Sequence, residues 1–266
     1  NSNVILLIHY VINYFIMVVV MTRLMYKEVK MNDTGNLAWM ITASALVLLM
    51  TPGLAFFYGG LVRAKNIVNT MMFSFISMGL ATIVCVLWGY SLAFSGTGPF
   101  IGNLDMFGLN GLDVTDGDTI IFVAFQGMFA IITPALITGA FAERFKFSTY
   151  MVFLVLWLTF VYAPICHWVW ASGGWLFERG ALDFAGGTVV HINAGIAAVA
   201  AAWLLGPRRN ISSGVEPHSV PFVLLGAGML WFGWFGFNAG SALASDARAT
   251  MAFLVTNIAA GTALTS

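Results

Sequence analysis

The chain has 266 residues, of which 60% are hydrophobic and only 8% are charged, and its basic and acidic side chains balance to a net charge of zero. Soluble domains carry about a quarter charged residues, so this composition excludes a soluble globular domain. The mean hydropathy of +0.90 is that of a membrane protein.

The first 30 residues differ from the rest of the chain. Residues 4–22 form an apolar run long enough to cross a membrane, and Arg23, Lys27 and Lys30 follow it. A signal peptide has its basic residues before the apolar run, so this segment does not fit one. We interpret residues 1–30 as an atypical apolar extension, such as an extra or interfacial helix, and 31–266 as the transmembrane domain.

Long stretches without Asp, Glu, Lys or Arg then follow one another along the chain. A helix needs about 20 apolar residues to cross the hydrocarbon core, whereas a membrane β-barrel shows short alternating segments. The pattern predicts an all-α polytopic membrane protein with about seven spans, the last of which stops where the chain stops. The stretches are 34–62, 66–104, 119–142, 147–177, 184–207, 217–245 and 249–266.

The charges between these spans predict the orientation in the membrane. The first, third and fifth connections contain six basic residues, and the other connections contain two. Because Lys and Arg of short loops stay in the cytoplasm, we expect the loops at 63–65, 143–146 and 208–216 to be cytoplasmic. The segment near Asn36 is then outside the cell.

Small residues are frequent within the spans, as in "TPGLAFFYGG" (51–60) and "GFNAGSALA" (236–244). Gly, Ala and Ser let helix backbones approach closely inside a membrane, so we expect a tightly packed helix bundle. Cys85 and Cys166 lie in apolar spans, and we interpret them as small buried hydrophobic residues rather than as a disulfide or a metal site.

His191 is the most informative polar residue, because it lies inside the charge-free stretch 184–207. An ionisable side chain within a membrane usually lines a pathway or a site, although a buried hydrogen bond between helices is the alternative. Asp183 precedes the same stretch. Its first interpretation is a cap for free helix amides, and an electrostatic role near an outer cation vestibule is the second.

Several long segments together resemble the ammonium transporter (Amt/Mep/Rh) family, and its Amt branch in particular. The resemblance covers residues 34–266, and the matching segments are "TPGLAFFYGGLVRAKN" (51–66), "AFQGMFAIITPALITGAFAERFKF" (124–147), "WLTFVYAPICHWVW" (157–170), "DFAGGTVVHINAG" (183–195) and "WFGWFGFNAGSA" (231–242). It implies a bundle of about eleven helices built from two inverted repeats. This chain would contain the first repeat and the start of the second, so it looks truncated at its C-terminus.

The resemblance also implies roles for individual residues. Phe125, Phe129, Trp170 and Ser241 match an outer site that recruits the cation, and Phe129 and Phe237 match stacked phenylalanines that gate the pore. His191 matches the first of two pore histidines, the second of which would lie beyond Ser266. Asp183 matches an aspartate that supports the outer site without touching the substrate. Neither a catalytic nor a metal-binding residue is implied.

These features predict transport of ammonium or ammonia across a cell membrane, without a cofactor. The alternatives are an ammonium sensor, an Rh-like gas channel, or a non-functional fragment that lacks the second pore histidine. An intramembrane enzyme would need a second and third ligand in the spans, as in an HExxH motif, or paired acids, and no such motif appears. As partners the resemblance implies the lipid bilayer, a homotrimer and a PII-type cytoplasmic regulator, but no nucleic acid.

Overall fold

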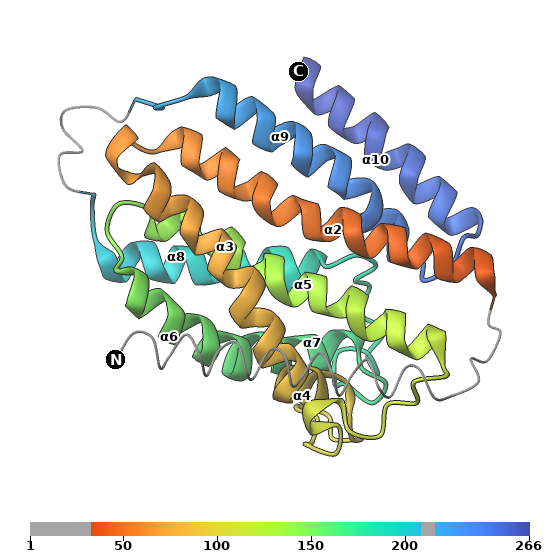
Figure 1. The fold of residues 1–266 in the computed structure, drawn as a ribbon. Coiled ribbons are helices and arrows are strands. Elements are labelled where there is room, and N and C mark those ends of the chain that lie inside the picture. The colour runs from red at the N-terminus through yellow and green to blue at the C-terminus, as the bar shows by residue number, and fades with distance from the viewer. Residues whose placement is uncertain (1–32, 209–215) are drawn as a thin grey trace, which may run out of the picture.

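The computed structural model describes residues 33–208 and 216–266, and within them it consists of helices and loops without strands (Figure 1). The predicted apolar extension 1–30 lies outside the described residues. So does most of the predicted cytoplasmic loop 208–216.

The first two spans form an antiparallel pair joined by a short turn. Helix α2 (Thr34–Leu61) begins where the Asp33 side chain accepts a hydrogen bond from the Asn36 amide, and the 3-10 turn η1 (Ala64–Asn66) follows it. Helix α3 (Ile67–Val84) continues through a π-helical segment, η2 (Cys85–Gly89), into α4 (Tyr90–Phe94). The second predicted span, 66–104, therefore consists of three joined helical segments, α3, η2 and α4.

The middle of the chain supplies the next two spans. After a long loop that contains the 3-10 turn η3 (Phe107–Leu109), α5 (Gly117–Phe141) crosses the bundle. Helix α6 (Phe147–Trp157) continues through the π segment η4 (Leu158–Tyr162) into α7 (Ala163–Trp170).

The last spans include two further π segments. Segment η5 (Gly187–Ile192) leads into α8 (Asn193–Leu205), and α9 (Val220–Trp234) leads into η7 (Phe235–Ala239). Helix α10 (Ala247–Thr265) begins at Asp246, whose side chain caps its first amides. The π form is frequent at functional sites in helices.

Six of the seven predicted spans are confirmed as helices long and apolar enough to cross a membrane. The seventh stretch forms α10, but this helix is not among the six. Its sequence, "ARATMAFLVTNIAAGTALT", contains Arg, Asn and several Thr that lower its hydropathy. The prediction of an all-α polytopic membrane protein is confirmed.

Helix α2 occupies the centre of the bundle and packs against α9, α5 and α3 (Figure 1). Glycines bring α2 and α9 into close contact, as the small residues predicted. A Cβ atom on Gly226 of α9 would lie 2.5 Å from the Gly53 carbonyl oxygen, and one on Gly60 of α2 would lie 2.6 Å from the Ser219 carbonyl oxygen. Any larger side chain at these positions would force the two backbones apart.

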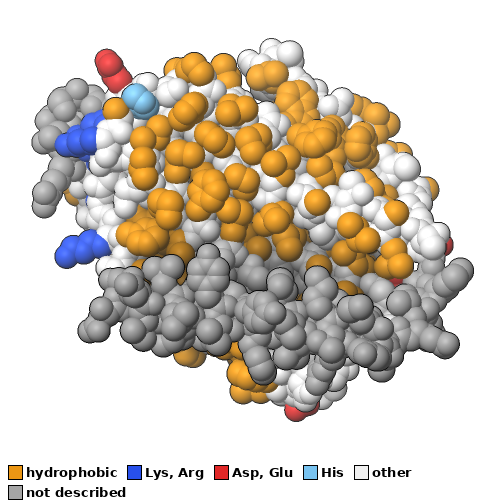
Figure 2. Space-filling view, viewed as in Figure 1, with side chains coloured by type: hydrophobic (Ala, Val, Ile, Leu, Met, Phe, Trp, Pro, Cys, Tyr) orange, Lys and Arg blue, Asp and Glu red, His pale blue; other side chains and the backbone are white. Residues whose placement is uncertain are grey.

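Basic side chains gather at one end of the bundle (Figure 2), where Arg63 and Arg144 follow α2 and α5 and where Arg208 donates a hydrogen bond to the Gly139 carbonyl oxygen of α5. There the Arg63 guanidinium donates to both carboxylate oxygens of Glu143 at 2.9 Å, and Asn66 donates to the same carboxylate. This network holds the pKa of Glu143 down to about 2. We call this the basic end; the end with most of the acidic loop residues, including Asp118 and Asp183, is the acidic end.

Candidate functional site

Four aromatic rings from three parts of the fold meet near the acidic end, with Phe129 at their centre. Its ring centroid lies 4.9 Å from that of Phe125, 5.7 Å from that of Trp170 and 4.6 Å from that of Phe237. We call these four residues the ring cluster. The resemblance assigned Phe125, Phe129 and Trp170 to the recruitment site and Phe129 and Phe237 to the gate, and the fold brings these four rings together.

The local structure explains how the rings reach one another. Phe125 and Phe129 are four residues apart on α5, so they project from the same face of this helix. Phe237 comes from the π segment η7, and Trp170 is the last residue of α7. Phe125, Phe129 and Phe237 are each 1% exposed, so three of the rings form part of the bundle core.

The contact between Phe129 and Phe237 differs from the stacked pair that the resemblance implied. Their ring planes are inclined at 55°, so the pair is tilted rather than parallel. Aromatic rings favour tilted or offset contacts over face-to-face stacking, because the electron-rich faces of two parallel rings repel each other. The two side chains are nevertheless in direct contact.

His191 lies beside Phe237, which in turn contacts Phe129. Its ring centroid is 5.6 Å from that of Phe237 and 5.8 Å from that of Trp234, whose ring is nearly parallel to the imidazole. The His191 residue is exposed in the described structure, since it lies on the open face of η5 and α8. The contacts therefore run in series from Trp170 through Phe129 and Phe237 to His191.

Trp234 was not predicted to belong to the site. Its ring contacts both His191 and Phe237. The sequence contained a signal, because in "WFGWFGF" Trp234 precedes Phe237 by three residues and so lies on the same side of a helix.

Asp183 caps the helix that carries His191. Its carboxylate accepts hydrogen bonds from four consecutive backbone amides, those of residues 186–189, at 2.6–2.9 Å. A negative charge is favourable there because the helix N-terminus presents free N–H groups and the positive end of its dipole. The Asp183 carbonyl oxygen also accepts a hydrogen bond of 3.0 Å from the Trp170 indole. One residue therefore fixes both the helix start and the Trp170 ring.

Ser241 lies four residues beyond Phe237, and its hydroxyl donates to the Phe237 carbonyl oxygen at 2.8 Å. A hydroxyl has one donor hydrogen and two acceptor lone pairs. Because the hydrogen is already engaged, the oxygen remains available as an acceptor for an N–H donor.

The part of the chain that the structure describes contains no group of three or more His, Cys, Asp or Glu side chains placed to hold a metal ion. Cys85 and Cys166 are buried free thiols, in agreement with their interpretation as small buried residues.

Comparisons with known proteins agree with these observations. The model of the Ammonium Transporter Family matches residues 38–266. The chain is 51% identical over 238 residues to an ammonium transporter of Aquifex aeolicus, an alignment that covers 87% of this chain and 56% of that protein.

Solved structures share the fold. The crystal structure of Candida albicans Mep2 is 40% identical, with a TM-score of 0.79, and the match covers 85% of this chain and 52% of that one. A structure described as a sensor Amt protein is 33% identical, with a TM-score of 0.78, and the match covers 85% and 59%. The chain thus spans about half the length of the relatives it matches. Together with the all-helical fold and the shared motifs, these findings show that the chain belongs to the ammonium transporter family.

Proposed function

We propose that the full-length protein carries ammonium across a cell membrane, and that the ring cluster and His191 line its path. The observation that carries this proposal is the unbroken series of ring contacts from Trp170 through Phe129 and Phe237 to His191. It would join a surface that can attract a cation to a side chain that can exchange a proton.

Trp170, Phe125 and Phe129 are suited to recruit the cation. Ammonium must lose water to enter an apolar path, and aromatic faces replace part of that water through cation–π contacts of about 0.5–2 kcal/mol each. The free lone pairs of Ser241 would accept an N–H bond. That bond is directional, so a potassium ion of similar size cannot make it equally well.

Phe129 and Phe237 are suited to act as the gate. Their centroids are 4.6 Å apart and both side chains are 1% exposed, so a substrate passes between them only if one ring moves. A charge within the membrane is costly, so passage favours neutral ammonia after the proton has been transferred. An imidazole accepts or donates a proton near neutral pH, which is the role proposed for His191.

The charge distribution supports an orientation with the acidic end outside and the basic end in the cytoplasm. The site then faces the outside of the cell, where ammonium enters. As family expectations, we also propose that the protein forms a homotrimer and that a PII-type cytoplasmic regulator contacts the basic end.

Substitution of Trp170 tests the recruitment site in the full-length protein. Trp170→Leu removes an aromatic face, and the apparent KM for ammonium uptake should rise by about 2- to 30-fold, the equivalent of one cation–π contact. The matched control is Trp203→Leu, because Trp203 is 84% exposed on α8 and lies outside the ring cluster. Equal uptake by Trp170→Leu and the control would contradict the assignment.

An ammonium sensor is the second candidate, because the chain is similar to a sensor Amt protein. Ammonium binding without net uptake into proteoliposomes would favour the sensor. Uptake by the purified protein would favour the transporter, as does the similarity to Mep2.

A further inference from the structure

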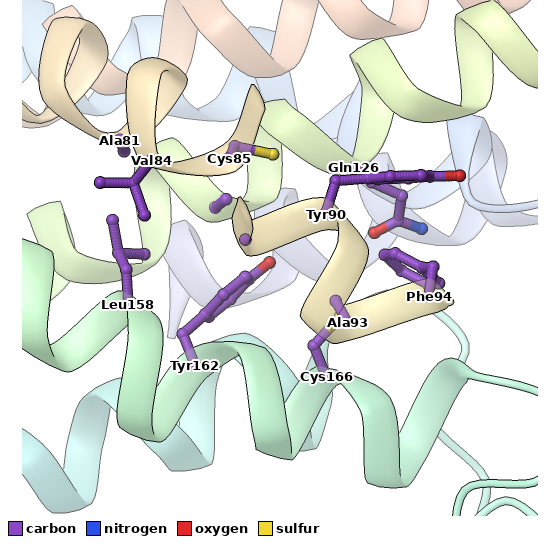
Figure 3. Close-up of a pocket in the computed structure, with 12 residues that line it drawn as sticks. Ala81, Val84, Cys85, Tyr90, Ala93, Phe94, Gln126, Leu158, Tyr162 and Cys166 are labelled. Carbon is purple, nitrogen blue, oxygen red and sulfur yellow. The ribbon is translucent and has the colours of Figure 1, made fainter. Parts of the chain in front are cut away.

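A small cavity lies between the segment η2–α4, helix α5 and the segment η4–α7 (Figure 3). Cys85 and Tyr90 line it from the first segment, Gln126 from α5, and Tyr162 and Cys166 from the third. About 20 Å³ of it is open to the centre of a water-sized sphere, and 10–15 Å³ is enough for one water molecule. The cavity therefore has room for a ligand of water's size.

Two polar atoms at this cavity make no hydrogen bond of 3.5 Å or shorter within the described residues, although the Thr133 side chain lies near one of them, the Tyr162 hydroxyl. They are the Tyr162 hydroxyl and the Gln126 side-chain oxygen, and both atoms are buried. Tyr162 as a whole is only 5% exposed. In Figure 3 the Gln126 amide turns its oxygen toward the side on which the Tyr162 hydroxyl lies. Buried polar atoms are almost always paired with protein or with ordered water, because leaving one unpaired costs free energy.

The chemistry of the lining restricts the ligand. No Asp, Glu, Lys, Arg or His side chain lines the cavity, so an ion held there would lack a compensating charge. A neutral molecule that both donates and accepts hydrogen bonds fits, since Gln126 offers an acceptor and Tyr162 offers a donor and an acceptor. Two of the three walls are π-helical segments, which are frequent at functional sites.

We infer that this cavity is a binding site for an internal water molecule held by Tyr162 and Gln126. The site is distinct from the ring cluster. On α5, Gln126 and Ala130 line the cavity, whereas Phe125 and Phe129 belong to the ring cluster. Because neighbouring residues of an α-helix are about 100° apart around its axis, the two pairs face different sides of α5. The inference does not rest on transport, since it concerns the pairing of polar atoms inside the bundle.

A structure of the full-length protein at about 2 Å resolution or better tests the site directly. The expected result is an ordered water within hydrogen-bonding distance of both the Tyr162 hydroxyl and the Gln126 oxygen. A dry cavity, or a water that contacts neither or only one of the two atoms, would overturn the inference.

Tyr162→Phe provides a second readout. If water is bound, the variant leaves that water with one partner fewer, and the apparent Tm should fall by about 2–4 °C. If the hydroxyl has no partner, its removal should leave the Tm unchanged or raise it, which counts against the site. Tyr150→Phe calibrates the measurement, because the buried Tyr150 hydroxyl pairs with Ser77 at 2.6 Å, so this variant should lose stability in either case. If the structure and the Tm of Tyr162→Phe disagree, the density at the cavity determines whether a water molecule is bound there.

Discussion

At the scale of single residues, position within a span does not by itself distinguish a histidine that faces the ring cluster from one that joins two helices. His167, like His191, lies in a charge-free stretch, but it is fully buried. Its two ring nitrogens lie 2.9 Å from the Ala93 carbonyl oxygen and 2.6 Å from that of Gly98. It therefore joins α7 to the end of α4, whereas His191 faces aromatic rings. That difference depends on distant backbone atoms, which the local sequence does not reveal.

Glu143 is a second residue whose importance comes from distant partners. Its side chain is 1% exposed and pairs with Arg63, which is 80 positions earlier in the chain and 32% exposed. In the sequence, Glu143 is noticeable only as an acidic residue beside the basic loop residues Arg144 and Lys146. In the structure it ties the connection after α2 to the connection after α5.

Acidification should therefore weaken this tie. The pKa of Glu143 is lowered from 4.5 to about 2 by Arg63 and Asn66, so the carboxylate stabilises the fold fully above about pH 4.5. That contribution is lost as the pH falls toward 2, because protonation then becomes favourable in the folded state as well.

The variant Glu143→Gln checks this account. At neutral pH it should lose about 1–2 kcal/mol of stability, a figure reduced for the solvent exposure of Arg63. Between pH 4.5 and 2 its apparent Tm should approach that of the parent. Glu216→Gln, an exposed position near the same end, is the control and should match the parent throughout. A constant difference between Glu143→Gln and the parent down to pH 2 would contradict the pKa assignment.

At the scale of elements, charge-free stretches predicted where the spans lie, because lipid excludes charged side chains. They did not predict the four π segments within the described helices. A π segment shifts the hydrogen-bond register by one residue while the composition stays equally apolar, so no hydropathy pattern marks it. Phe237 and His191 both lie in such segments, and the orientation of their rings therefore could not be derived from ideal helical spacing.

The contact between α2 and α9 gives the prediction at this scale. Gly226→Ala places a methyl group against the backbone of Gly53 and Phe57, so overpacking should lower stability by about 1–3 kcal/mol. Gly228→Ala is the matched control on the same helix, since no atom lies within 4 Å of its added Cβ. It should be neutral or stabilise by up to about 1 kcal/mol. Equal thermal stability of the two variants in detergent would show that close approach of α2 and α9 is not required.

At the scale of the whole molecule, composition and motif order were sufficient to predict the fold class and the family. The gathering of basic loops at one end follows from the alternation of the spans. Membrane orientation, however, is a property of the protein in a cell, and it remains a prediction from the positive-inside rule.

Cysteine labelling tests this orientation. Ala64 and Asn110 are exposed and lie in the first and second connections, and both native cysteines are buried, so background labelling should be low. In intact cells an impermeant thiol reagent should label Asn110→Cys but not Ala64→Cys, and permeabilisation should make Ala64→Cys reactive. The reverse pattern would place the acidic end in the cytoplasm.

The central claim is that ammonium passes the ring cluster and reaches His191, and substitution of His191 in the full-length protein tests it most directly. His191→Glu keeps a group that can exchange a proton, but its negative charge favours a substrate that stays charged, so selectivity for ammonium over potassium should fall. His191→Ala should reduce transport while folding is largely retained, because its removal also relieves the cost of an imidazole at membrane depth. The decisive measurement is ammonium and potassium flux, recorded beside detergent-extracted yield and apparent Tm. Normal yield with lowered selectivity in His191→Glu is the predicted result, whereas low yield with unchanged selectivity of the surviving protein would contradict the account.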